Sequence, residues 1–245
     1  MTTVFLNNQF IPENEARIPI EDRGFLFGDG VFTTIKVSNR NIELLDEHLE
    51  RLRLQCQELH IIPPDIDKQW FQELIRLNEA FSGTWKLKIV ITGGNEKALA
   101  LPERSHGCLL ITLEPYEVSE ASVRLTVFPM PIVRPLSKLK SLSYLDRLCV
   151  ADYAKNAGFD DALVLSPEGF VLETAFSNVF WRHAGRVYAP DPALPFLEGV
   201  TCQHYFKSLE QPVGYAKMCL DEMPGDAEFY SCNALKGIVR ATLIS

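Results

Sequence analysis

Lys140 is the residue of this chain with the clearest potential for covalent chemistry. It lies in the stretch 137–144, in largely apolar surroundings, just ahead of a predicted helix. A desolvated lysine has a lowered pKa, and its neutral amine can form a Schiff base with an aldehyde. A solvated surface lysine is the ordinary alternative, and Lys138 competes for the covalent role. The residue types alone leave these interpretations open.

A second candidate is Glu173, which ends the apolar stretch 169–173. A carboxylate in such a strand is costly to bury without a cation, and a protonated pyridine nitrogen is one cation that would serve. A glutamate on an edge strand facing water has the same sequence pattern. Glu173 therefore indicates an electrostatic role only in combination with other residues.

Phosphate binding is indicated at three places. Gly199-Val200-Thr201 precede a predicted helix, whose first backbone amides could hold a phosphate. Arg51 could add a bidentate cation, or it could pair with Glu47 four positions earlier on the same helix. The polar turn 231–234 offers a hydroxyl and an amide. Each of these features is also compatible with an ordinary turn, cap or ion pair.

Elements that could position these residues follow from turn chemistry and periodicity. Asn7-Asn8 tolerate the positive φ of a hairpin turn between apolar stretches at 4–6 and 9–11. Apolar residues at helical spacing predict an amphipathic helix over 43–59. A glycine-rich turn at 23–30, a strand at 31–37, a helix at 67–80 and strands at 87–92 and 108–113 complete an α+β domain over 1–115. Residues 116–121 are polar and are expected to form a linker.

The remaining residues, 122–245, are expected to form a larger domain that carries Lys140. Ser143 and Asp146 have the spacing of a capping box, which predicts a helix over 144–156. A β-meander is expected within 162–182, and a second helix over 201–209. Strands are expected at 123–128, 228–232 and 237–243.

Composition narrows the classes of partner. The 245 residues carry a formal net charge of −8, which argues against nucleic-acid binding and favours a small-molecule substrate. No window has the roughly 20 apolar residues of a membrane span, and the first residues lack the pattern of a signal peptide. Six cysteines without C-x-x-C spacing are expected to be reduced thiols. We therefore expect a cytoplasmic protein with no membrane partner and no metal.

Together the motifs resemble the fold-type IV enzymes that use pyridoxal 5'-phosphate (PLP), a family with the two-domain α+β fold of D-amino-acid aminotransferase. The R-G-x-x-x-G-D-G-x-F segment corresponds to residues 23–32, and the H-x-x-R-L helix to residues 48–52. The Schiff-base lysine of the family matches Lys140, whereas Lys138 does not fit the spacing. The E-x-x-x-x-N motif matches 173–178, and the G-[IV]-T motif matches 199–201.

The resemblance implies roles for individual residues. The implied catalytic residues are Lys140, Glu173 and Thr33. The implied cofactor-binding residues are Arg51, Lys140, Tyr144, Glu173, Asn178, Gly199, Val200, Thr201 and Asn233. Family members are homodimers, so a homodimer is expected here.

Within the family, two positions are most similar to aminodeoxychorismate lyases. Thr33 stands where aminotransferases of this fold usually have glutamate, and Asn233 lies in a Cys-Asn-Ala-Leu turn where transaminases more often have Gly-Thr-Ala. An aminotransferase for D-amino or branched-chain amino acids is the alternative, and a non-catalytic PLP-binding protein is a more distant one. The usual arginines for a substrate carboxylate are missing after residue 92; either Lys97 or Arg104 replaces their charge, or the substrate differs.

Overall fold

The computed structural model describes residues 2–104, 107–119 and 121–244. Backbone contacts divide the chain into two units. The first unit comprises Met1–Val118 and Leu139–Ser143, and the second comprises Ser119–Lys138 and Tyr144–Ser245. The boundary after Val118 falls within the expected linker.

The short segment Leu139–Ser143 belongs to the first unit, whereas Lys140 was expected in the second domain. The reason is its backbone pairing. The Lys140 carbonyl accepts a hydrogen bond from the Phe32 amide at 2.9 Å, and the Leu142 amide donates to the Gly30 carbonyl at 2.9 Å. The candidate covalent lysine is therefore carried on a segment that pairs with a strand of the first unit.

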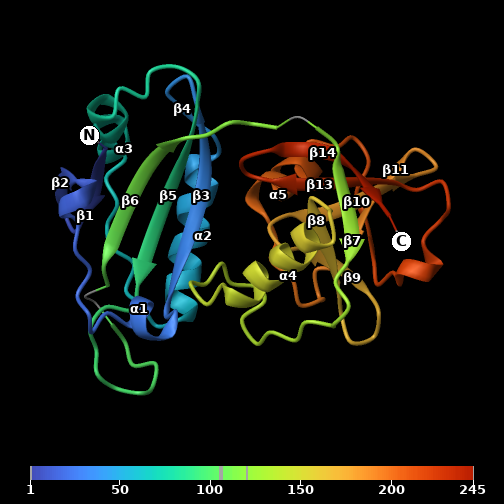
Figure 1. The fold of residues 1–245 in the computed structure, drawn as a ribbon, viewed down its shortest axis with the longest axis horizontal. Helices are drawn as coiled ribbons and strands as arrows, with labels where there is room; N and C mark the ends of the chain where they lie inside the picture. Colours follow the sequence, from blue (N-terminus) through green and yellow to red (C-terminus); the bar gives the residue numbers. More distant parts are fainter. Residues whose placement is uncertain (1, 105–106, 120, 245) are drawn as a thin grey trace. The chain divides into compact units, whose positions relative to one another are not determined.

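The first unit is built on one antiparallel sheet in the order β2-β1-β6-β5-β3-β4 (Figure 1). Asn7 and Asn8 adopt φ values of 46° and 70°, which confirms the expected hairpin. The strands are β1 (Thr3–Leu6), β2 (Gln9–Pro12), β3 (Gly30–Ser38), β4 (Asn41–Ile42), β5 (Thr84–Thr92) and β6 (Leu109–Pro115). A 3-10 turn, η1 (Glu13–Glu15), follows the hairpin.

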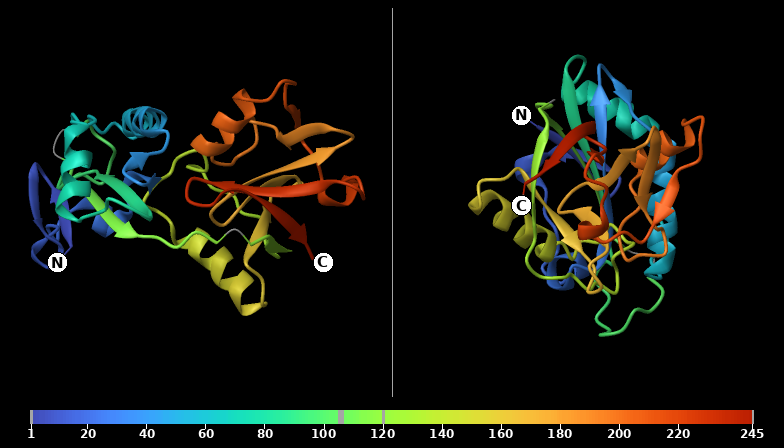
Figure 2. Two further views of the ribbon diagram at one scale, coloured as in Figure 1. Left: turned by 90° about the horizontal axis from the view of Figure 1, so that it is seen from above. Right: turned by 90° about the vertical axis from the view of Figure 1, so that its right-hand side faces the viewer.

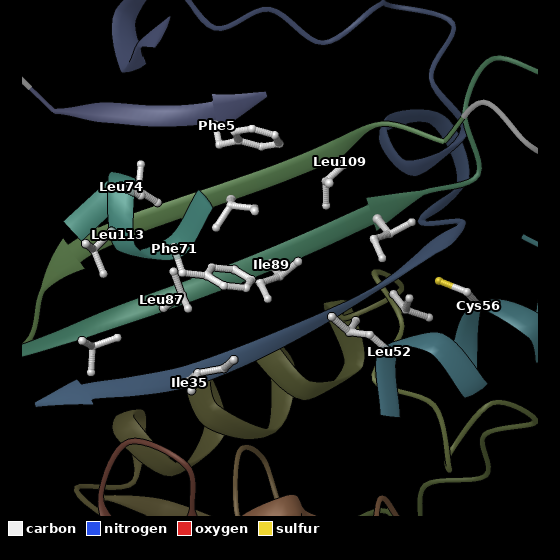
Figure 3. Packing of buried hydrophobic residues seen from close by; sticks show 14 of the residues in the cluster. Phe5, Ile35, Leu52, Cys56, Phe71, Leu74, Leu87, Ile89, Leu109 and Leu113 are labelled. Carbon is white, nitrogen blue, oxygen red and sulfur yellow. The ribbon is translucent and has the colours of Figure 1, made fainter. Parts of the chain in front are cut away.

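Helices α2 (Leu45–Glu58) and α3 (Gln69–Leu77) confirm the two helices that apolar periodicity predicts in this unit. Their buried side chains join those of the strands in one core (Figure 3). Leu52 of α2, Phe71 of α3 and Ile89 of β5 lie in this core, and each is at most 1% exposed. Burial of this apolar surface is the main force that holds α2 against β3.

The glycine-rich stretch at 23–30 is partly helical, where a turn was expected. Helix α1 (Arg23–Phe27) begins because the Asp22 carboxylate accepts hydrogen bonds from the first amides of the helix, and it ends at Gly28, whose φ of 65° is left-handed. Asp29 then accepts from Arg23 Nε at 2.6 Å and also pairs with Arg104. This part of the motif forms a buried ion-pair network.

The second unit contains strands that close into a ring. The sheet runs β12-β11-β10-β13-β14-β7-β8-β9, and β9 also pairs with β10. Antiparallel pairing of β8 with β9 and of β9 with β10 confirms the meander expected within 162–182. Parallel pairings also join β7 to both β8 and β14. The strands are β7 (Val123–Val127), β8 (Asp161–Leu165), β9 (Val171–Thr174), β10 (Asn178–His183), β11 (Arg186–Pro190), β12 (Gly214–Ala216), β13 (Glu228–Asn233) and β14 (Gly237–Leu243).

Alternation along these strands creates separate cores. Leu163 and Val179 face the cluster inside the ring, whereas Val164 packs with α4 (Leu145–Asn156) and Phe180 packs with α5 (Val200–Lys207). Figure 2 shows α4 in yellow and α5 in orange outside the strands. A short 3-10 turn, η2 (Leu220–Glu222), precedes β13. Among the described residues, no helix is long and apolar enough to span a bilayer.

The expected capping box at the start of α4 is wrong. The helix begins at Leu145 with Tyr144 in the cap position, and no side chain caps it. The Ser143 hydroxyl instead donates to the Phe27 carbonyl at 3.5 Å, and the Asp146 carboxylate accepts from the Arg147 amide and pairs with Arg134. In a capping box the Ser143 hydroxyl would accept from the Asp146 amide, and the Asp146 carboxylate would accept from the Ser143 amide. The observed contacts are with other groups.

Candidate functional site

Lys140 lies beside an aromatic ring in the first unit. Its Nζ is 4.6 Å from the centroid of the Phe32 ring, and its backbone amide donates to Gln55 Oε1 at 3.2 Å. The residue is half-buried. Hydrogen bonds of the main chain therefore fix the position of this segment, and with it the backbone that carries the Lys140 amine.

Thr33 and Arg51 meet in the same unit, together with a residue for which no role was predicted. The Thr33 hydroxyl accepts a hydrogen bond from Arg51 Nη2 at 2.8 Å and lies 2.7 Å from His48 Nδ1. Burial, followed by the charges of Arg51 and Lys140, lowers the pKa of His48 to about 3. The i,i+3 spacing of His48 and Arg51 on one helix face was the available sequence signal for this contact.

Glu173 is buried in the second unit, and it has a cationic partner in the protein itself. Arg147 Nη2 donates to Glu173 Oε1, and Arg147 Nη1 donates to the Thr174 carbonyl at 2.9 Å. The exposed fractions of the paired side chains are 6% and 7%. Burial raises the pKa of the Glu173 carboxyl, while Arg147 opposes that rise. Nothing in the sequence pattern singles out Arg147, because its partner is 26 residues away.

Asn178 holds the loop that leads into α5. Its Nδ2 donates to the Leu197 carbonyl at 2.6 Å, and its Oδ1 accepts from the Gly199 amide at 2.8 Å. A Cβ on residue 199 would lie 2.2 Å from that Oδ1, so the contact requires glycine. Gly199 is the cap residue of α5, and Val200 and Thr201 form its first turn. Asn178 therefore sets the position of the G-V-T backbone.

The turn after β13 is fixed by Asn233. The side-chain Nδ2 of Asn233 donates to Ser177 Oγ at 3.0 Å, and its Oδ1 accepts from the amides of Leu235 and Lys236 at 3.0 and 2.9 Å. Both ends of the amide are engaged within the protein. In this structure Asn233 shapes the turn and links it to the segment between Glu173 and Asn178.

Tyr144 also lies close to that segment. Its ring stacks on Phe176 with centroids 6.0 Å apart and planes 13° apart. Burial raises the pKa of the Tyr144 phenol, and the charges of Arg147 and Glu173 act on it in opposite directions. Of the predicted residues, the second unit thus brings together Tyr144, Glu173, Asn178, Gly199, Val200, Thr201 and Asn233 around one end of the strands.

The cations considered as alternatives have other positions. Lys138 is exposed and donates to the Pro192 carbonyl. Lys97 is exposed, with its Nζ 3.6 Å from the carboxylate of Glu21. Arg104 is 4% exposed and pairs with Asp29 inside the first unit. The suggestion that Arg104 replaces a substrate-binding arginine is therefore wrong, because a buried ion pair occupies its guanidinium.

Residues 30–244 match the family model described as amino-transferase class IV. The chain is 27% identical over 248 residues to an aminodeoxychorismate lyase of Vibrio harveyi, covering 94% of this chain and 89% of that protein. It is 28% identical over 213 residues to a D-alanine aminotransferase of Staphylococcus haemolyticus, covering 82% and 73%.

A solved structure shows the same fold. The PLP-bound form of a hypothetical aminotransferase from Mycobacterium tuberculosis superposes with a TM-score of 0.83 at 19% identity, covering 98% of this chain and 90% of that one. The fold expected from the sequence motifs is thereby confirmed.

Proposed function

Because the chain belongs to the amino-transferase class IV family, a family of PLP-dependent enzymes, we propose that it is a lyase that converts 4-amino-4-deoxychorismate to 4-aminobenzoate and pyruvate. The family and the cofactor agree with the predictions made from the sequence motifs.

The side chains fit the cofactor that the family implies. The Lys140 amine, on its anchored segment, is the group that would bind an aldehyde. In the first unit, Arg51 has the charge and geometry suited to a phosphate. In the second unit, the first backbone amides of α5 are likewise suited to a phosphate, and Gly199 has no Cβ that would collide with Asn178. The buried Glu173 carboxylate is suited to a protonated ring nitrogen.

When bound, PLP supplies an aldehyde that links to amines and a pyridine ring that withdraws electrons from the carbon bearing the amine. In the proposed reaction Lys140 would hold the cofactor, and its amine would take the proton from the substrate carbon that bears the amine and later return a proton. Glu173 would hold a proton at the ring nitrogen, and Arg51 would balance the phosphate charge. The atoms of the substrate are fully accounted for by the two products, so no keto-acid acceptor is needed.

The single observation that carries the lyase assignment is Thr33. At this position aminotransferases of the fold usually have glutamate, whereas here a fully buried threonine contacts Arg51 and His48. A hydroxyl leaves the positive charge of Arg51 in place, whereas a glutamate would pair with it. The relative that covers 94% of the chain bears the name aminodeoxychorismate lyase, which supports the same assignment.

An aminotransferase acting on D-amino acids is the second candidate. It is favoured by the 28% identity to a D-alanine aminotransferase. Such an enzyme would use the Lys140 amine to move a proton from the substrate carbon to the cofactor. It would also require a keto acid to receive the amino group.

The two candidates differ in their need for this acceptor. The purified protein, supplied with 4-amino-4-deoxychorismate from a coupled synthase and with no keto acid, should release pyruvate and 4-aminobenzoate in equal amounts. Lys140→Ala is the matched control and should release neither. Absence of both products, together with amino transfer from D-alanine to 2-oxoglutarate, would establish the aminotransferase in place of the lyase.

A further inference from the structure

We propose that Thr33 and His48 are positioning residues that hold Arg51 in place for the phosphate of the cofactor. This inference rests on the proposed function, since it concerns how the same site binds PLP. It also assigns Thr33 a role different from the catalytic one that the sequence motifs imply.

The three side chains form a chain of hydrogen bonds between β3 and α2. Thr33 is completely buried and His48 is 2% exposed. The Thr33 hydroxyl oxygen has two partners within the described residues: Arg51 Nη2 at 2.8 Å and His48 Nδ1 at 2.7 Å. A guanidinium can only donate, so the hydroxyl accepts from Arg51. Its single hydrogen then remains for His48 Nδ1.

The charge state of His48 is consistent with this arrangement. Its pKa is lowered to about 3, first by burial and then by Arg51 and Lys140, so the imidazole is neutral near pH 7. A neutral imidazole can accept a hydrogen bond at Nδ1. A protonated ring would direct a second positive charge and a second N–H donor toward the oxygen that already accepts from Arg51. The neutral His48 ring is therefore the fixed acceptor that orients the Thr33 hydroxyl.

Two consequences follow from the orientation of this hydroxyl. Thr33 cannot give up its hydrogen to a substrate without breaking its bond to His48. The hydrogen bond to Thr33 also restricts the rotamers of Arg51 before any ligand binds. Less side-chain entropy is therefore lost when Arg51 binds a phosphate. The contribution of Thr33 is thus expected in affinity for the phosphate group.

The test compares PLP with pyridoxal, which lacks the phosphate. Dissociation constants of both are measured on the apoprotein by absorbance titration for wild type, Thr33→Val, Thr33→Ser, His48→Leu and His48→Asn. Thr33→Val removes the hydroxyl that Arg51 contacts, and His48→Leu removes the acceptor that orients this hydroxyl. Both variants should bind PLP about 10-fold more weakly than wild type, with little change in the affinity for pyridoxal. Thr33→Ser retains the hydroxyl, and His48→Asn places an amide oxygen where Nδ1 lies, so both should retain the wild-type ratio of the two affinities. Thr34→Val, next to Thr33 on the strand, is the matched control.

Several results would overturn the inference. An unchanged affinity ratio in Thr33→Val, accompanied by lost turnover, would make Thr33 a catalytic residue. Equal weakening of PLP and pyridoxal would indicate a general disturbance of the fold. If the variants change PLP affinity as described but the wild-type protein has no lyase activity, only the proposed reaction is refuted. A wild-type protein that binds neither compound would refute both proposals.

Discussion

The buried pair of Glu173 and Arg147 predicts a distinctive response to Glu173→Gln. The pair is nearly inaccessible to water, with exposed fractions of 6% and 7%. Removing one member of a buried pair costs about 3 to 5 kcal/mol, because the other charge remains buried. The glutamine oxygen can still accept from Arg147, so we expect the lower end, about 3 kcal/mol. This corresponds to a fall in Tm of about 6 to 12 °C for a chain of this size.

A double-mutant cycle on the apoprotein measures the coupling free energy between Glu173 and Arg147 without any contribution from the reaction. Arg147→Met removes the cation, and the apoprotein is then expected to hold Glu173 protonated because burial raises the pKa of its carboxyl. The folded state of this variant binds a proton that the unfolded state has released, so its stability falls as the pH rises. Urea unfolding should therefore show a larger loss relative to wild type near pH 8 than near pH 5. The double variant should lose less stability than the sum of the single variants.

Turnover supplies the second measurement. With PLP occupancy held complete, Glu173→Gln should lower turnover on the order of 100-fold, comparable to the loss of one preorganised electrostatic contact. Full turnover at full occupancy would refute a role of the carboxylate in the reaction. A stability loss below about 1 kcal/mol, or additive effects in the cycle, would refute the energetic importance of the buried pair.

Three further outcomes test the candidate site. Lys140→Ala should abolish the borohydride-reducible link to PLP and Lys138→Ala should retain it, and peptide mapping of the adduct to any other lysine would contradict the assignment. Gly199→Ala should weaken PLP binding on the order of 10-fold by calorimetric titration, because the added Cβ would lie 2.2 Å from an amide oxygen, whereas Gly225→Ala, which has open space around it, should not. The buried, neutral His48 should make the apoprotein lose about 1.4 kcal/mol of stability per pH unit as the pH falls from 6.5 toward about 3, since the unfolded state alone binds the proton. His48→Asn should remove this contribution, and equal pH slopes in variant and wild type would count against it.

The sequence alone determined much of the local structure and the order of the motifs. Asn7-Asn8 predict the hairpin because the conformational preferences of these two residues are local, and periodicity predicts α2 and α3 because each helix shows one apolar face to the core. The family and fold were also accessible, because the R-G-x-x-x-G-D-G, H-x-x-R and G-V-T segments have a characteristic spacing along the chain.

Tertiary structure decided which charges and hydroxyls meet. Arg104 was a candidate for substrate binding, and only the fold shows that it pairs with Asp29, 75 residues away. The sequence does not reveal that Arg147 is buried, because its burial depends on pairing with Glu173, which is 26 residues away. The sequence also could not predict that the Lys140 segment pairs with β3. Periodicity and turn chemistry act over a few residues, whereas partners of buried polar groups are selected by the cost of leaving those groups unsatisfied, which depends on the whole fold.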